Sequence, residues 1–298
     1  MKKSRLIAAI FVAFALTTVL FTACKDDEEK PKPDASFSFS ASGNGLTITF
    51  TNESTEAETY EWAFGDGETS TEVNPTHTYP DFGTFNVTLT ATGPGGTDEF
   101  TYPLVVTKAS PVKLDDNSFD DWSTVPLTFQ SVDNSGGLID KIKIDYNGEF
   151  IFFYMEVKDN LTDSLPTALH FDLDNDTTTG FRPWTNTGIG TEFYIEAAIT
   201  TGGWASAFMF DKDAAQTDWI WIPKDITDFI VYGFHAQNGA MVTTEWAIRK
   251  SKMDAITTNG NVVLGSKVTL IINHYDSGWE PAGFFPGNGE AAYVLVMQ

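Results

Sequence analysis

Short stretches in which apolar and polar residues alternate follow one another along most of the chain. A period of two indicates strands with one buried face, and turn residues between such strands are typical of antiparallel sandwiches. Within residues 34–107, Gly, Pro and Asn separate the stretches. This segment is therefore predicted to form a small β-sandwich with strands near residues 36–42, 46–52, 59–64, 84–92 and 99–106.

The same pattern returns in the C-terminal part of the chain, where only residues 250–256 suggest a helical turn. Polar residues and a proline at 108–113 predict a linker before it. The fold class is therefore all-β, with two β-sandwich domains at 34–107 and 114–298. The strands of the larger sandwich are expected near residues 141–147, 149–157, 168–174, 191–199, 206–210, 229–236, 241–248, 267–275 and 291–297.

The first residues have the pattern of a targeting segment. Lys2, Lys3 and Arg5 precede a long apolar run that ends in small residues before Cys24. This order predicts a signal peptide at residues 1–23, and an uncleaved membrane anchor is the alternative. The junction "FTAC" resembles the lipobox of bacterial lipoproteins, although phenylalanine stands where leucine is commoner. The resemblance implies a lipid on Cys24 and a membrane as partner through that anchor.

Residues 24–33 are charged, contain prolines and lack apolar side chains, so we expect a flexible tether. Acids directly after the cysteine resemble the surface-export signal of outer-membrane lipoproteins in gut-type glycan-degrading bacteria. This resemblance implies a protein anchored in the outer membrane and facing the cell exterior.

Composition excludes one large class of partners. The chain has 18 Lys and Arg against 41 Asp and Glu, a net charge of −23, and no basic run. Phosphate backbones would be repelled, so no nucleic-acid binding is expected. A single cysteine allows no internal disulfide, so stability must come from packing or a metal ion.

Three motifs mark the first sandwich: "WAFGDG", "NPTHTY" and "GTFNVTLT". Together they resemble the PKD domain, an immunoglobulin-like module common in secreted bacterial proteins that act on glycans. The resemblance implies that Trp62 lies in the core. Asp66 and His77 then serve turns and inter-strand hydrogen bonds. We expect this domain to act as a spacer.

Residues 111–298 resemble the family 9 carbohydrate-binding modules through "LDDNSFDDWSTVP", "EFIFFYMEVKD" and "FDLDNDTTTGF", which follow in that order. The resemblance implies a sandwich that binds polysaccharide or oligosaccharide, with Trp122 buried.

The stretch "FDLDNDTTTGF" crowds three carboxylates into five residues. An EF-hand is excluded because Thr177 and Pro183 stand where that loop needs Gly and Glu. A divalent cation would relieve the repulsion among the acids. Similar modules bind calcium at this place, which implies Asp172, Asp174 and Asp176 as ligands of a structural Ca²⁺. A solvated acidic turn is the alternative.

Catalysis has little support from the same residues. Asp172 and Asp174 would lie about 7 Å apart on a strand, inside the range of inverting glycosidases, but no sequence feature supplies a desolvated partner acid. Glu192 and Glu196 would lie about 13 Å apart, which is too far. G-x-S-x-G and H-E-x-x-H motifs are absent from the sequence. We therefore expect no enzyme activity, and a glycoside hydrolase stays a weak alternative.

Aromatic residues give the stronger functional lead. Trp219 and Trp221 would share one strand face about 7 Å apart, and Trp184 and Trp279 lie among turn residues. Flat side chains suit the apolar faces of sugar rings. These four tryptophans are the predicted ligand-binding residues, with burial as the alternative for each. Trp122 and Trp246 are expected in the core.

These observations predict a non-catalytic cell-surface lipoprotein that captures oligo- or polysaccharide for neighbouring glycan-uptake or degradation proteins. A shallow site predicts affinity on the order of micromolar to millimolar. An adhesion or scaffold protein that binds another protein is the alternative.

Overall fold

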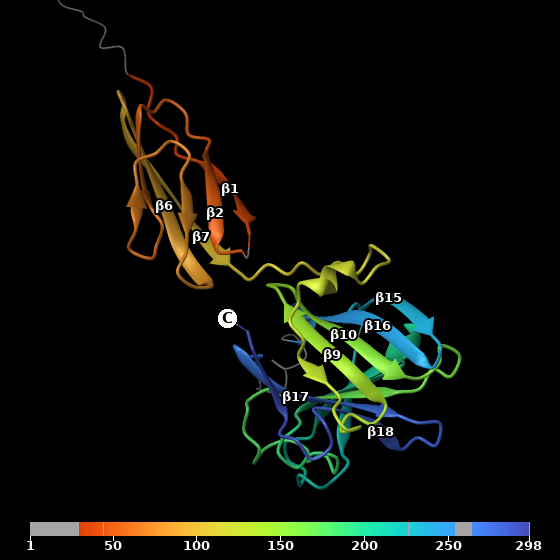
Figure 1. The fold of residues 1–298 in the computed structure, drawn as a ribbon. Helices are drawn as coiled ribbons and strands as arrows, with labels where there is room; N and C mark the ends of the chain where they lie inside the picture. Colours follow the sequence, from red (N-terminus) through yellow and green to blue (C-terminus); the bar gives the residue numbers. More distant parts are fainter. Residues whose placement is uncertain (1–29, 44, 226, 254–263, 298) are drawn as a thin grey trace, which may run out of the picture. The chain divides into compact units, whose positions relative to one another are not determined.

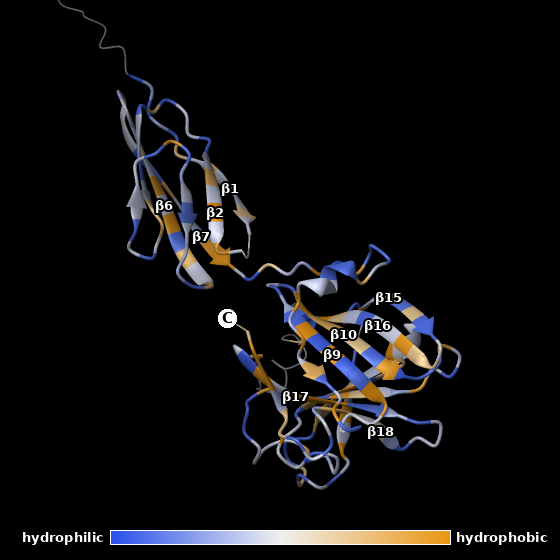
Figure 2. Ribbon diagram, in the orientation of Figure 1, coloured by the Kyte–Doolittle hydropathy of each residue, from blue (hydrophilic) through white to orange (hydrophobic). Residues whose placement is uncertain are grey.

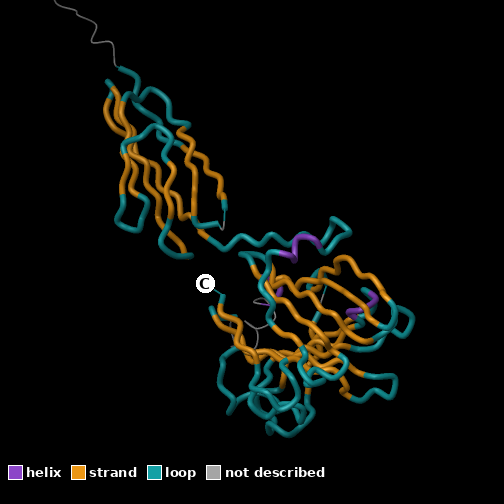
Figure 3. Tube along the Cα trace, viewed as in Figure 1, coloured by secondary structure: helices purple, strands orange, loops and turns teal. Residues whose placement is uncertain are grey.

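A computed structural model describes residues 30–43, 45–225, 227–253 and 264–297 (Figure 1). The predicted signal peptide, Cys24 and most of the predicted tether lie outside the described residues. Strands and loops make up nearly all of the structure, so the predicted all-β fold class is confirmed (Figure 3). Residues 250–253 are helical, as expected, and the rest of that predicted turn is not described. No helix among the described residues is long and apolar enough to span a membrane.

The first sandwich consists of a three-stranded and a four-stranded sheet. The three-stranded sheet has the order β1 (Phe37–Ser42), β2 (Thr47–Asn52), β5 (Thr76–Thr78). The four-stranded sheet has the order β4 (Thr69–Ser70), β3 (Thr59–Ala63), β6 (Gly83–Gly93), β7 (Gly96–Val106). Trp62 is fully buried between them, as predicted, and its Nε1 donates a hydrogen bond to the carbonyl of Glu72 at 2.9 Å.

The second sandwich also has two antiparallel sheets. One has the order β15 (Ile230–Asn238), β16 (Met241–Arg249), β10 (Phe150–Lys158), β9 (Ile139–Tyr146), β8 (Phe129–Gln130). The other has the order β14 (Trp221–Lys224), β13 (Ala205–Phe210), β12 (Phe193–Ala197), β11 (Thr167–Asp172), β17 (Lys267–Tyr275), β18 (Pro281–Phe285), with β19 (Tyr293–Val296) also paired to β17. Two short 3-10 helices, η1 (Asp120–Ser123) and η2 (Ile199–Thr201), lie in the connections. The predicted linker at 108–113 falls between β7 and η1.

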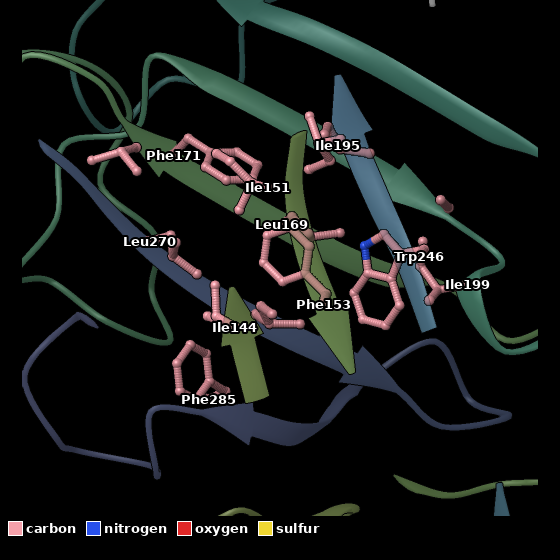
Figure 4. Close-up of a cluster of buried hydrophobic side chains, with 14 of the residues drawn as sticks. Ile144, Ile151, Phe153, Leu169, Phe171, Ile195, Ile199, Trp246, Leu270 and Phe285 are labelled. Carbon is pink, nitrogen blue, oxygen red and sulfur yellow. The ribbon is translucent and has the colours of Figure 1, made fainter. Parts of the chain in front are cut away.

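The core of the second sandwich comes from one face of each sheet (Figures 2 and 4). Leu169 and Ile195 project from β11 and β12, and Phe153 and Trp246 come from β10 and β16. Trp246 is stacked on Phe153 with ring centroids 5.2 Å apart, so its predicted core position is confirmed. Because side chains alternate along a strand, the residues between these core positions project from the opposite face of each sheet.

Trp122 in η1 is also buried, and it packs on Phe152 and Ala247 of β10 and β16. Its Nε1 donates a 2.6 Å hydrogen bond to Glu245 Oε2, and Glu245 is itself 1% exposed. Trp122 thus fills a small apolar cluster and satisfies a buried carboxylate.

Replacing Trp122 with phenylalanine should therefore lower the free energy of unfolding by about 1–3 kcal/mol, the usual cost of leaving a buried polar group without its partner. Urea denaturation measures this change. Combining Trp122→Phe with Glu245→Gln gives a double-mutant cycle, and the two effects should not add. Additive effects would contradict a dependence on this hydrogen bond.

Candidate functional site

A row of polar and aromatic side chains crosses the outer face of the sheet that contains β11, β12 and β13. The strand register places His170 opposite Tyr194, and Tyr194 opposite Phe208. These positions alternate with core residues such as Leu169 and Ile195. The row therefore forms a floor on the side of the sheet away from the core.

Loop aromatics gather over one end of this floor. The ring of Trp219 lies 5.6 Å from Tyr194 and 5.0 Å from Phe181, measured between centroids. Trp184 lies 5.8 Å from Trp219 at an interplanar angle of 47°. Trp221 lies 5.4 Å from Trp219 and 5.2 Å from Tyr194. Three of the four predicted tryptophans are thus brought together in one cluster.

Exposure separates the members of this cluster. Trp184 is 67% and Trp219 52% exposed, whereas Trp221 is half-buried against the floor. Trp279 is 60% exposed but occupies the turn between β17 and β18, with a φ of 62°. Within the described residues, Trp279 has no ring contact with the other three. Its predicted role as a ligand-binding residue stays a prediction.

A narrow slot of about 10 Å³ lies between Trp184 and Trp219, with room for about one water-sized group. Polar side chains also line the slot. Asn273 Nδ2 donates a hydrogen bond to Thr185 Oγ1 at 3.1 Å, and the buried His170 has its pKa lowered to about 3 by desolvation. His170 is consequently neutral at physiological pH. The slot offers uncharged donors and acceptors beside two exposed rings.

Three carboxylates meet at the end of β11. Asp172, Asp174 and Glu192 each place an oxygen within 4.8 Å of the other two. Glu192 precedes β12, and its Oε2 accepts a hydrogen bond from the backbone amide of Leu173 at 2.9 Å. Asp172 is 1% exposed, and its Oδ1 has no hydrogen-bond partner among the described residues. We call these three residues the carboxylate cluster.

Asp176, the third predicted calcium ligand, lies outside the carboxylate cluster. Its Oδ1 instead accepts hydrogen bonds from the amide and hydroxyl of Thr178, at 2.9 and 2.6 Å, and these bonds hold its pKa below the usual value. Its part in metal binding stays a prediction. The sequence did not predict Glu192 as a metal ligand, because it lies far along the chain from Asp172 and Asp174. The pairing of Phe171 with Phe193 brings the residues that flank them to one edge of the sheet.

Burial disfavours ionisation of the two buried members of the carboxylate cluster, Asp172 and Glu192. Desolvation is the largest cause of the raised pKa of Glu192, about 8, and the negative charges of Asp174 and Asp172 add to it. Desolvation likewise raises the pKa of Asp172 to about 6. A hard divalent cation with oxygen ligands fits this group, because it would pair with the free Oδ1 and relieve the repulsion.

Gln216 connects the loop of the carboxylate cluster with the tryptophan loops. Its Nε2 donates hydrogen bonds to the carbonyls of Thr177 and Thr179, at 3.1 and 2.6 Å. Its Oε1 accepts one from Arg182 Nη2 at 2.9 Å, and its backbone carbonyl accepts one from the Arg182 amide at 2.9 Å. Trp184 and Trp219 follow these residues closely along the chain. The side chain of Gln216 therefore links the loop of the carboxylate cluster to the loops that carry Trp184 and Trp219.

The first sandwich can be placed in a family by comparison with known proteins. Residues 28–107 match the family model described as PKD domain. This part of the chain belongs to the PKD domain family. The segment is similar to the PKD1 domain of the Vibrio cholerae metalloprotease PrtV, with 34% identity, 26% of this chain and 98% of that chain covered, and a TM-score of 0.24. The segment is also similar to the PKD1 domain of Vibrio anguillarum Epp, with 32% identity, 26% of this chain and 96% of that chain covered, and a TM-score of 0.24.

A third solved structure is similar over more of the chain than the PKD domain. This structure is described as the structural basis for the promiscuous specificity of carbohydrate-binding modules from the β-sandwich superfamily. Its sequence is 14% identical, the match covers 82% of this chain and 96% of that chain, and the TM-score is 0.29. A search of curated proteins found no significant match.

Proposed function

We propose that the protein is a non-catalytic glycan-binding protein whose ligand stacks on Trp184 and Trp219. The observation that carries this proposal is the exposed pair itself, with ring centroids 5.8 Å apart above a polar slot. Folding buries most large aromatic surface, so two neighbouring tryptophans left more than half exposed are available to a partner.

The chemistry around the pair suits a sugar. Trp184 and Trp219 offer flat apolar surface to the C–H faces of a pyranose ring, and Asn273 and Tyr275 line the slot between them with groups that pair with hydroxyls. Because the rings stand open to solvent, binding buries little surface, and affinity on the order of micromolar to millimolar is expected.

The carboxylates are assigned to a cation rather than to hydrolysis. Glu192 does have the raised pKa that a general acid needs, and the sequence alone did not indicate such a group. However, each member of the carboxylate cluster places one oxygen within 4.8 Å of the other two, and three oxygens that converge on one point suit the coordination of a single ion. Calcium held by Asp172, Asp174 and Glu192 is therefore part of the proposal.

The cellular setting is proposed from the N-terminal sequence. A lipid on Cys24 would anchor the chain in the outer membrane, facing the exterior, and the PKD domain would act as a spacer. Captured glycan would then pass to neighbouring uptake or degradation proteins.

One experiment tests this function against its alternatives. The purified protein is titrated calorimetrically with plant and host glycans, and each mixture is assayed for cleaved product. Binding without cleavage supports the proposal, and product formation demands the hydrolase alternative. No binding to any glycan favours an adhesion or scaffold role, for which the exposed Ile220 and Ile222 beside Trp219 would supply an apolar contact surface.

A further inference from the structure

A second concave surface adjoins the carboxylate cluster. It is a pocket of about 600 Å³ between the loops at 174–180 and 209–216. Asp174 and Glu192 lie on its wall, and Phe210 and Ile222 give it apolar surface. This volume is within the range of roughly 300–1,000 Å³ that small-molecule sites occupy.

We propose that this pocket is a second sugar subsite, in which a divalent cation held by Asp172, Asp174 and Glu192 binds neighbouring hydroxyls of the glycan directly. The inference rests on the proposed glycan-binding function and extends it. Calcium would then belong to the ligand site and would not serve the fold alone.

The distribution of ligands around the cluster supports this role. Calcium takes about six to eight oxygen ligands, and the cluster provides three carboxylates. Asp172 is buried, and its Oδ1 has no hydrogen-bond partner among the described residues. Asp174 and Glu192 border the pocket. Asp172 therefore approaches the ion from the buried end of β11, and the coordination positions on the side of Asp174 and Glu192 are open to the pocket.

The charges on the pocket wall indicate the class of ligand. The wall carries four acids, which are Asp174, Glu192, Asp211 and Asp213, against two lysines, Lys212 and Lys224. Lys212 is paired with Asp213 at 2.7 Å. Even with a divalent cation in place, this wall is not electropositive enough to favour a sulfated or uronic acid glycan. A neutral sugar with adjacent hydroxyls fits best, since such hydroxyls are oxygen ligands without a charge.

The pocket and the tryptophan pair are neighbours on the same sandwich. Phe210 lies 6.0 Å from Phe181 and 5.4 Å from Trp221, between ring centroids. Phe181 also borders the slot between Trp184 and Trp219. An oligosaccharide stacked on the tryptophans can extend past these rings into the pocket, so the two subsites would bind one chain.

The test titrates the full protein with cellohexaose, xylohexaose and mannohexaose, each in calcium and in a chelator. For the hexaose that binds best, affinity should be at least tenfold higher in calcium, the effect of about 1.4 kcal/mol. By reciprocity, the hexaose should raise calcium affinity by the same factor, measured with a competing chelator dye.

Three variants sharpen the result. Glu192→Gln and Asp172→Asn should remove the calcium effect on sugar affinity. Asp163→Asn serves as the control, because Asp163 lies in the exposed loop between β10 and β11, outside the carboxylate cluster and the pocket wall. In Asp163→Asn the tenfold effect should persist. Far-UV circular dichroism verifies that each variant is folded.

Three outcomes would overturn the inference. If calcium binds and leaves hexaose affinity unchanged, the ion is structural only, and the glycan-binding function at the tryptophans still stands. If no calcium binds, the subsite does not exist in this form. A protein that binds no hexaose or other glycan in either buffer would overturn the glycan-binding function, and the subsite with it.

Discussion

Replacing Trp184 or Trp219 with alanine is expected to lower glycan affinity about 30-fold, which corresponds to about 2 kcal/mol and is typical of a central aromatic contact. Both rings are more than half exposed and their centroids lie 5.8 Å apart, so each supplies one part of the same stacking surface. Calorimetric titration measures the loss. The free energy of unfolding should change little, since neither ring lies in the core.

Trp204 supplies the matched control for this prediction. It is 42% exposed and lies before β13, and it has no ring contact with Trp184 or Trp219 in the described structure. Trp204→Ala should bind glycan like the parent protein. Equal losses in all three variants would show that the pair has no special role. Trp279→Ala decides in the same titration whether the fourth predicted tryptophan contacts the ligand.

Stability should fall as pH rises through neutrality when calcium is removed. The pKa of Glu192 is raised from 4.5 to about 8 by burial, so the folded protein binds this proton more tightly than the unfolded chain. Its contribution is complete below about pH 4.5 and is lost as pH rises through about 8. Since each pKa unit is worth about 1.4 kcal/mol, we expect a loss on the order of 3 kcal/mol between pH 5 and 8.

Urea denaturation in a chelator measures this profile, and the difference between the protein and Glu192→Gln isolates the contribution of this carboxyl. The glutamine variant should have the flatter profile over that pH range. Saturating calcium should restore about 1–3 kcal/mol at pH 8, because the ion binds the ionised cluster of the folded state. Identical profiles for the two proteins would exclude Glu192 as the cause.

The fold could be predicted from the sequence because it depends on the local alternation of apolar and polar residues. Alternation along each strand separates Leu169 from His170, and Ile195 from Tyr194, without knowledge of any partner strand. The core positions of Trp62, Trp122 and Trp246 followed from motifs and strand patterns and are confirmed.

The residues of the site were harder to predict from the sequence, because they are brought together by strand register and loop placement. Glu192 reaches Asp172 only because β11 and β12 are neighbours in antiparallel register, which no spacing along the chain reveals. Trp219 was expected within a strand, yet β14 begins at Trp221, and Trp219 lies in the loop before it. Loop positions are fixed by contacts such as those of Gln216, which join residues more than thirty positions apart.

The hydrogen bonds of Gln216 also bear on how this site can be redesigned. Because the Gln216 side chain bonds to Thr177, Thr179 and Arg182, the loops at 174–184 and 211–221 are joined by hydrogen bonds. Transplanting one loop into another sandwich would leave carbonyls and a guanidinium without their partner. New ligand specificity is therefore best sought by exchanging both loops together, with Gln216 kept as the link between them.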